Sequence, residues 1–335
     1  MNSIELVDPE LRPLLRALPA EPVSDESLAR YRALSFVAAS DVTENTVSLE
    51  RRLAPGPNGA PSVELLVYRP IAITGLLPCV YHIHGGGFVM GAAANQETAH
   101  RRLAAELGCV VVSVDYRLAP ETAFPGPLDD CYAGLAYVFS HAQMLGIDRA
   151  SIGVAGESAG GGLAAGLALL VRDRGEFVLA FQHLIYPMLD DRTCTLDEPH
   201  PVAGEFIWPA ASNRFGWTAY LGTAPGGPDV SPYAAPARAV DLAGLPPTFI
   251  ATGALDLFVD EDLAYARRLI RAGVAVELHV YPGTIHAFDM MERSRVARTL
   301  AADGTAALRR AFGRKLLISS EGLSERRVDP NLVQT

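Results

Sequence analysis

The sequence predicts an α/β protein with a mostly parallel central sheet flanked by helices, and three observations support this. Short apolar segments rich in β-branched residues recur between residues 62 and 282. Helical stretches separate most of them, and this alternation is typical of a parallel sheet that is covered on both faces. Two of the segments end in glycine-containing motifs, HGGG at 84–87 and GESAG at 156–160.

Length and composition narrow the class of protein. The chain has 335 residues, 49% of them hydrophobic, which is enough for one large α/β domain with insertions. A net charge of −10, without a Lys/Arg cluster, argues against a nucleic-acid partner. No apolar run reaches the roughly 20 residues that span a bilayer, and the N-terminus does not resemble a signal peptide. We therefore expect no stable membrane association and a cytoplasmic location.

The four cysteines do not indicate a metal site. They form no C-x-x-C pair and have no zinc-like spacing to a histidine. Free cysteine commonly behaves as a small hydrophobic residue. We therefore expect reduced thiols in the core and no bound metal.

Residues 1–50 are predicted to form N-terminal cap helices. Ser24, followed by two acidic residues, is typical of a helix N-cap. Residues 51–189 form the first part of the predicted core. Its strands are expected within segments 62–70, 76–85, 109–117, 151–158 and 181–187, and its helices at 93–107, 128–145 and 159–173.

Residues 190–245 interrupt the alternation, because they contain many Pro, Gly and aromatic residues but no clear strand. Such long loops in a compact domain are usually functional. We predict a cap segment over the sheet; the alternative is a packing excursion without catalytic importance. The second part of the core, 246–314, holds expected strands within 247–256 and 274–282 and expected helices at 259–272 and 291–313. Residues 315–335 are predicted to be a polar, frayed C-terminal tail.

Ser158 is the candidate nucleophile. It lies in G-x-S-x-G between an expected strand and an Ala/Leu-rich helix. A sharp strand-to-helix turn exposes the hydroxyl at the edge of the sheet, and small residues on either side let the turn close. The motif alone is common, and a glycine-rich turn with an incidental serine is the alternative. Its placement between strand and helix favours the catalytic interpretation.

The HGGG run gives the candidate oxyanion hole. Attack on a carbonyl creates a negatively charged oxygen, and glycines let backbone N–H groups approach it closely. We assign the donors to Gly85, Gly86 and Ala159. A phosphate-binding loop is the alternative, but neither G-x-x-x-x-G-K-[ST] nor the spaced G-x-G-x-x-G fingerprint is present.

A serine hydroxyl needs a base, usually a histidine oriented by a carboxylate, and the chain order in this class is serine, acid, histidine. His286 follows the last expected strand on a Pro/Gly loop, whereas His279 lies within that strand. Asp256 directly follows the preceding strand. The predicted triad is therefore Ser158, Asp256 and His286. We further expect Phe88, Phe206 and Trp208 to shape the substrate pocket.

These motifs resemble those of the bacterial hormone-sensitive-lipase-like esterases, the family IV carboxylesterases of the α/β-hydrolase fold. The similar pieces are HGGGF at 84–88, DYRLAPE at 115–121, GESAGG at 156–161, YPMLDDR at 186–192, LDLFVDED at 255–262 and HAF at 286–288. Leu257 departs from the usual acid motif, Asp-Pro-Leu. We interpret the polar residues of DYRLAPE and YPMLDDR as supports of loops near the site.

The resemblance implies a helical cap, a small-molecule ester substrate with a short or medium acyl chain, and no cofactor. It is also compatible with a homodimer. Two alternatives stay open. The same triad would also suit an amide, carbamate or lactone, and a relative without catalysis would bind a small ligand.

Overall fold

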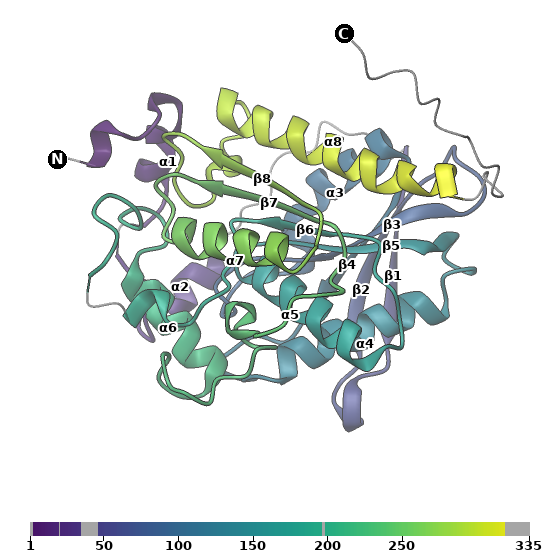
Figure 1. The fold of residues 1–335 in the computed structure, drawn as a ribbon, viewed down its shortest axis with the longest axis horizontal. Helices are drawn as coiled ribbons and strands as arrows, with labels where there is room; N and C mark the ends of the chain where they lie inside the picture. The colour runs from purple at the N-terminus through teal and green to yellow at the C-terminus, as the bar shows by residue number, and fades with distance from the viewer. Residues whose placement is uncertain (1–2, 20, 35–45, 196–197, 319–335) are drawn as a thin grey trace, which may run out of the picture.

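The structure is a computed structural model that describes residues 3–19, 21–34, 46–195 and 198–318. An eight-stranded sheet with the order β1-β2-β4-β3-β5-β6-β7-β8 forms its centre (Figure 1). Strands β1, β2 and β4 pair antiparallel, and all other neighbours pair parallel, which confirms the predicted mostly parallel sheet. The strands are β1 Val47–Ala54, β2 Val63–Pro70, β3 Leu77–Ile83, β4 Val110–Asp115, β5 Ile147–Glu157, β6 Gln182–Ile185, β7 Thr248–Gly253 and β8 Val276–Tyr281.

Helices cover both faces of the sheet. Helices α3 and α8 lie on one face and α4, α5 and α7 on the other, while α1, α2 and α6 gather at one end of the molecule (Figure 1). The α-helices are α1 Arg12–Ala17, α2 Leu28–Ala33, α3 Glu97–Leu107, α4 Gly126–Ser140, α5 Ala159–Arg174, α6 Ala210–Leu221, α7 Val259–Arg271 and α8 Arg295–Ile318. The short 3₁₀ helices are η1 Ser3–Glu5, η2 Pro9–Leu11, η3 Pro57–Gly59, η4 Ala93–Gln96, η5 Thr193–Thr195, η6 Pro236–Arg238 and η7 Phe288–Met290.

Burial on both faces explains why the central strands are continuously apolar. In β4, Val110, Val112 and Val114 pack in the cluster under α4 and α5. Val111, between them, packs on the opposite side with residues of α3 and α8. Successive side chains of a strand point to opposite faces, so a sheet covered twice needs apolar residues at every position.

Some predicted boundaries are wrong at the ends of the chain. β1 begins at Val47, inside the expected N-terminal cap of residues 1–50. It is an edge strand with exposed Glu50 and Arg51, so it lacks the apolar signature of the other strands. Helix α8 runs to Ile318, beyond the expected core boundary at 314. Part of the expected cap, residues 35–45, and the tail from residue 319 lie outside the described residues.

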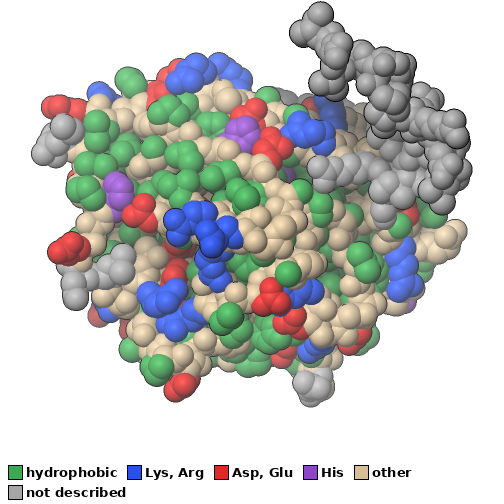
Figure 2. All heavy atoms as spheres, viewed as in Figure 1, with side chains coloured by type: hydrophobic (Ala, Val, Ile, Leu, Met, Phe, Trp, Pro, Cys, Tyr) green, Lys and Arg blue, Asp and Glu red, His purple; other side chains and the backbone are tan. Residues whose placement is uncertain are grey.

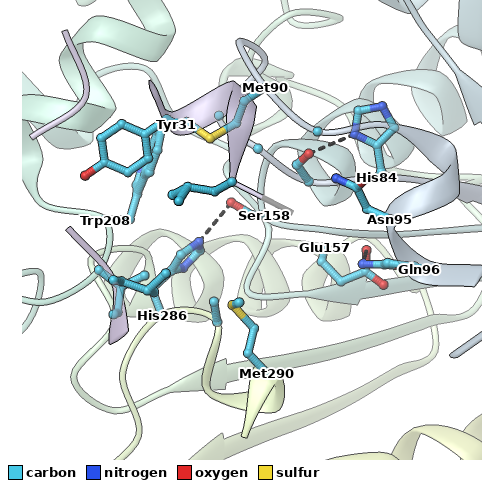
Figure 3. A pocket seen from close by; sticks show the side chains of 18 of the residues that line it. Tyr31, His84, Met90, Asn95, Gln96, Glu157, Ser158, Trp208, His286 and Met290 are labelled. Atoms are coloured by element: carbon cyan, nitrogen blue, oxygen red, sulfur yellow. Dashed lines mark hydrogen bonds between the residues drawn. The ribbon is translucent and has the colours of Figure 1, made fainter. Parts of the chain in front are cut away.

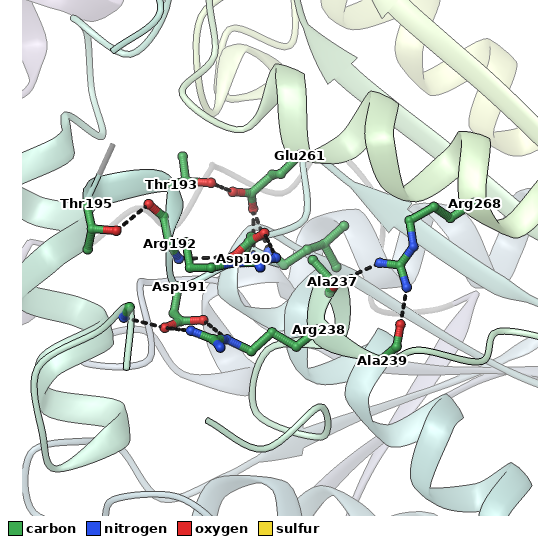
Figure 4. A network of polar contacts seen from close by, with 12 residues as sticks. Asp190, Asp191, Arg192, Thr193, Thr195, Ala237, Arg238, Ala239, Glu261 and Arg268 are labelled. Atoms are coloured by element: carbon green, nitrogen blue, oxygen red, sulfur yellow. Dashed lines mark hydrogen bonds and ion pairs between the residues drawn. The ribbon is translucent and has the colours of Figure 1, made fainter. Parts of the chain in front are cut away.

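A network of polar contacts joins the two ends of segment 190–245 to each other and links the segment to α7 (Figure 4). The fully buried carboxylate of Asp191 accepts two hydrogen bonds from Arg238, at 2.6 and 2.8 Å, and one from the amide of Gly226. Glu261 of α7 accepts from the amides of Leu189 and Asp190 at the start of the segment. As expected for supporting residues, the acids of YPMLDDR hold the loop in place.

The N-terminal helices are joined to the same end of the core. The Arg32 guanidinium of α2 donates to the carbonyls of Val89 and Ala119, at 2.7 and 2.9 Å, and pairs with Glu121. The amide of Val23 donates to the hydroxyl of Ser212 in α6. The short helices from both cap segments are therefore tied to the core and to each other.

On the face drawn in Figure 2, Lys and Arg side chains lie among acidic and apolar ones. Among the described helices, none is long and apolar enough to cross a membrane. The cysteines are free and buried, as expected: Cys79, Cys109, Cys131 and Cys194.

Candidate active site

Ser158 lies in the turn between β5 and α5, where the sequence predicted it. Its backbone has φ 54° and ψ −122°, a conformation that L-residues rarely adopt. A Cβ on Gly156 would lie 2.4 Å from the carbonyl oxygen of Gly160, and one on Gly160 would lie 2.1 Å from that of Ile83. The glycines are therefore necessary for this tight turn, which presents the hydroxyl at the carboxyl end of the sheet.

His286 and Asp256 complete a chain of hydrogen bonds from Ser158, and Figure 3 shows the first of these, between Ser158 and His286. His286 Nε2 is 2.9 Å from Ser158 Oγ, and His286 Nδ1 is 2.8 Å from Asp256 Oδ2. A carboxylate only accepts, so Nδ1 carries the proton and Nε2 is free to accept from the serine hydroxyl. All these side chains are buried, and the second oxygen of Asp256 accepts from the amide of Phe258 at 3.0 Å. The structure thus brings together the predicted nucleophile, base and acid.

The glycine loop that follows β3 lies against the serine. A Cβ on Gly85 would be 3.5 Å from the Cβ of Ser158, and Gly86 and Gly87 have φ values of 121° and 59°. His84 fixes the start of this loop, because its Nδ1 donates to the carbonyl of Gly85 at 2.8 Å. Burial lowers the pKa of His84 to about 4, so its imidazole is neutral near pH 7.

The side chain of Glu157, the residue directly before the nucleophile, supports the turn through hydrogen bonds. His82 donates to its carboxylate at 2.9 Å and Gln96 at 3.2 Å. Burial opposes ionisation of Glu157, but the attraction and hydrogen bond of His82, with help from Gln96, outweigh it and lower the pKa. Glu157 therefore carries a negative charge at the wall of the site.

A cavity of about 840 Å³ opens onto Ser158. Trp208 lines it, as predicted, together with residues of both cap segments, among them Tyr31, Arg32 and Ile207. Other lining residues are Met90 from the glycine loop, Tyr186 from the end of β6, and Asp289 and Glu292 beyond the catalytic histidine. These residues could not be predicted from the sequence, because the position of the pocket depends on how distant segments pack.

The expectation that Phe88 and Phe206 line the pocket is wrong. Phe88 has φ 66°, and its fully buried ring stacks on Tyr220 in the core at 4.0 Å between centroids. Phe206 packs in the cluster beneath the N-terminal residues, which includes Leu11 and Leu14. The position of a residue in a motif does not reveal the direction of its ring.

Comparison with known proteins agrees with this geometry. Residues 80–290 match the family described as having the α/β hydrolase fold. The chain belongs to the α/β hydrolase family. This confirms the family resemblance at that level, and the matched range holds every residue of the predicted triad.

Relatives in this family are named as esterases. Carboxylesterase NlhH of Mycobacterium tuberculosis is 35% identical over 91% of this chain and 96% of its own. A solved structure named Bacterial Heroin Esterase is 43% identical, covers 93% of this chain and 99% of its own, and has a TM-score of 0.86. Esterase LipW from Mycobacterium marinum is 33% identical, with coverage of 93% and 98% and a TM-score of 0.78. This chain is, like them, a carboxylic ester hydrolase.

Proposed function

We propose that the protein is a serine carboxylesterase for short- to medium-chain esters that works through an acyl-enzyme on Ser158. The observation that carries the proposal is the continuous hydrogen bonding from Ser158 through His286 to Asp256, at 2.9 and 2.8 Å. These distances are within the reach that a base and its orienting acid need.

The reaction begins when His286 Nε2 takes the proton of Ser158 as its oxygen attacks the ester carbonyl. Asp256 stabilises the imidazolium that forms and keeps the ring in the correct tautomer. His286 then protonates the leaving alcohol, and an acyl-enzyme remains. Water, deprotonated by the same imidazole, attacks the acyl carbon, and the acid is released as Ser158 recovers its proton.

We assign the oxyanion hole to the backbone amides of Gly85, Gly86 and Ala159. The support is positional: Gly85 lies against Ser158, and Ala159 begins α5 at its positively polarised N-terminus. The helix start and the glycine loop lie on either side of the nucleophile. Both therefore suit an oxygen that becomes negative during attack.

The cap assignment is also a proposal. Tyr31 and Trp208, from the two cap segments, line the same cavity, so these segments would set which acyl and alcohol groups fit. The cytoplasmic location and the homodimer stay predictions.

The test is covalent labelling with a fluorophosphonate, followed by peptide mapping, and steady-state hydrolysis of p-nitrophenyl esters. The wild type should carry the adduct on Ser158, and Ser158→Ala should lose kcat by about 10⁶. Ser151→Ala, in the middle of β5, is the matched control and should keep wild-type turnover. Turnover by Ser158→Ala within tenfold of wild type, or a folded wild type without a Ser158 adduct, would contradict the proposal.

Matched ester and amide substrates distinguish an esterase from an amidase that uses the same triad. A kcat/KM for an acetyl ester well above that of the corresponding acetamide supports an esterase. The reverse order would indicate an amidase that uses the same triad.

A further inference from the structure

Tyr186 and Asp289 lie next to the catalytic histidine, and the proposed reaction does not use them. The rings of Tyr186 and His286 are in edge contact, with 4.8 Å between centroids and 64° between planes. The Tyr186 hydroxyl donates to Asp289 Oδ1 at 2.5 Å. Tyr186 follows β6, whereas Asp289 belongs to η7, which begins shortly after His286. This bond therefore joins the histidine loop to the sheet.

We propose that Tyr186 and Asp289 are positioning residues that hold the His286 loop in the geometry required for proton transfer. The inference rests on the proposed function, since it assumes that His286 is the base. It assigns neither side chain a step with the reacting atoms. Each affects the reaction only by fixing the position of the imidazole.

The backbone on the two sides of His286 shows why such a restraint is needed. Before the histidine, the carbonyl of Thr284 accepts from the amide of Leu255, and the carbonyl of Gly283 accepts from that of Asp8, both at 2.9 Å. After it, the chain turns through Ala287 with φ 56°, in the left-handed region. An L-residue stays there only when the surroundings impose it. The Tyr186–Asp289 bond restrains the chain on this second side.

Tyr186 is itself firmly placed. Its backbone has φ 35°, and its amide donates to the carbonyl of Ala251 at 2.6 Å. The side chain is 3% exposed. Burial raises the pKa of its hydroxyl well above the ordinary value, so the hydroxyl remains a donor over the range in which esterases are assayed. A donor fixed on the sheet can hold its acceptor on the histidine loop in place.

Apolar packing is the competing explanation for the order of this loop. Phe288 is fully buried, with its ring centroid 6.2 Å from that of Tyr186 and 5.6 Å from that of Tyr281. Tyr186→Phe keeps the ring and this packing and removes only the hydroxyl. The variant therefore separates the hydrogen bond from the apolar contact.

The experiment compares Tyr186→Phe, Asp289→Ala and Asp289→Asn with a matched control, Tyr281→Phe. Tyr281, on β8, also donates to an aspartate, Asp303 at 2.8 Å, but does not line the cavity. Each variant is assayed with an ethyl ester and a p-nitrophenyl ester of the same acid. Nitrophenolate leaves without protonation, whereas ethoxide needs the proton of His286.

With the ethyl ester, Tyr186→Phe and Asp289→Ala should lose about 10- to 10²-fold in kcat, the range expected for a misplaced catalytic group, with little change in KM. The loss in kcat/KM should be smaller with the p-nitrophenyl ester than with the ethyl ester. Asp289→Asn keeps an acceptor oxygen and should recover most of the activity, and Tyr281→Phe should resemble wild type. The double variant Tyr186→Phe/Asp289→Ala should lose little more than either single variant, because both break the same bond.

Two results would overturn the inference. One is a Tyr186→Phe enzyme that matches Tyr281→Phe with both esters. The other is an equal loss of kcat with both esters that is matched by an equal loss in the fraction of Ser158 labelled by fluorophosphonate, because that pattern indicates misfolded enzyme. A wild type without esterase turnover would instead contradict the proposed function, so the two failures are distinguishable.

Discussion

Removal of Arg238 should destabilise the fold strongly, because it leaves a buried carboxylate without its counter-charge. The Asp191 side chain is 0% exposed and that of Arg238 12%, and the guanidinium makes two bonds of 2.6 and 2.8 Å. Breaking a buried pair by deleting one partner costs about 3–5 kcal/mol. The amide of Gly226 still donates to Asp191, so we expect the lower end, a loss of about 3 kcal/mol in the free energy of unfolding for Arg238→Ala.

Equilibrium unfolding in urea, followed by tryptophan fluorescence, measures this loss. Both tryptophans, Trp208 and Trp217, lie within segment 190–245, whose two ends the Asp191–Arg238 pair joins. Arg192→Ala is the control: its side chain is 48% exposed, so its pair with Asp190 should contribute at most about 1 kcal/mol. A loss for Arg238→Ala that is no larger than the loss for Arg192→Ala would refute the reasoning.

The remaining predictions concern charge and space. Burial raises the pKa of Glu261 in the folded protein well above 4.5, its ordinary value. The stability that the protonated carboxyl contributes is therefore fully present below pH 4.5 and is lost as the pH rises toward the folded-state pKa. Glu261→Gln has no such titration. In urea unfolding at a series of pH values, its free energy of unfolding should therefore rise relative to that of the wild type as the pH increases. A Cβ on Gly87 would lie 2.1 Å from the ring of Trp208, and Gly87 has φ 59°. Gly87→Ala should therefore lower the free energy of unfolding, measured in urea, by about 1–3 kcal/mol. It should also lower kcat/KM, because the ring of Trp208 in the cavity wall must shift. Glu157 carries a negative charge at the cavity wall, and the lining Arg32 is already paired with Glu121, so kcat/KM for ethyl succinate monoanion should be at least about tenfold below that for ethyl butyrate at low salt; equal values would contradict this charge effect.

The triad could be predicted from the sequence because its members follow strands in a fixed chain order. Ser158 lies in a motif whose small residues are required by the turn, and His286 and Asp256 follow the last two strands. Local sequence carries all of this information. The central strands were predictable for a similar reason, since burial on both faces leaves continuous apolar runs.

Other features depend on contacts between distant residues, and the sequence did not reveal them. β1 is charged because one side of an edge strand is open. Phe88 sits beside the glycine loop, yet its backbone turns the ring into the core. Tyr186 and Asp289 are 103 positions apart, and neither residue type, taken alone, indicates a bond between them. Such features follow from the packed fold and not from a local pattern.

The hydrogen bonds of the triad span 128 positions between Ser158 and His286 and 30 between Asp256 and His286. They join the ends of β5, β7 and β8, so the half of the sheet from β5 to β8 must be assembled before Ser158 becomes reactive. Contacts of such long sequence separation form late and slowly during folding. The rate at which Ser158 becomes phosphonylated after dilution from urea should therefore report when the half of the sheet from β5 to β8 is complete, recorded on a single atom.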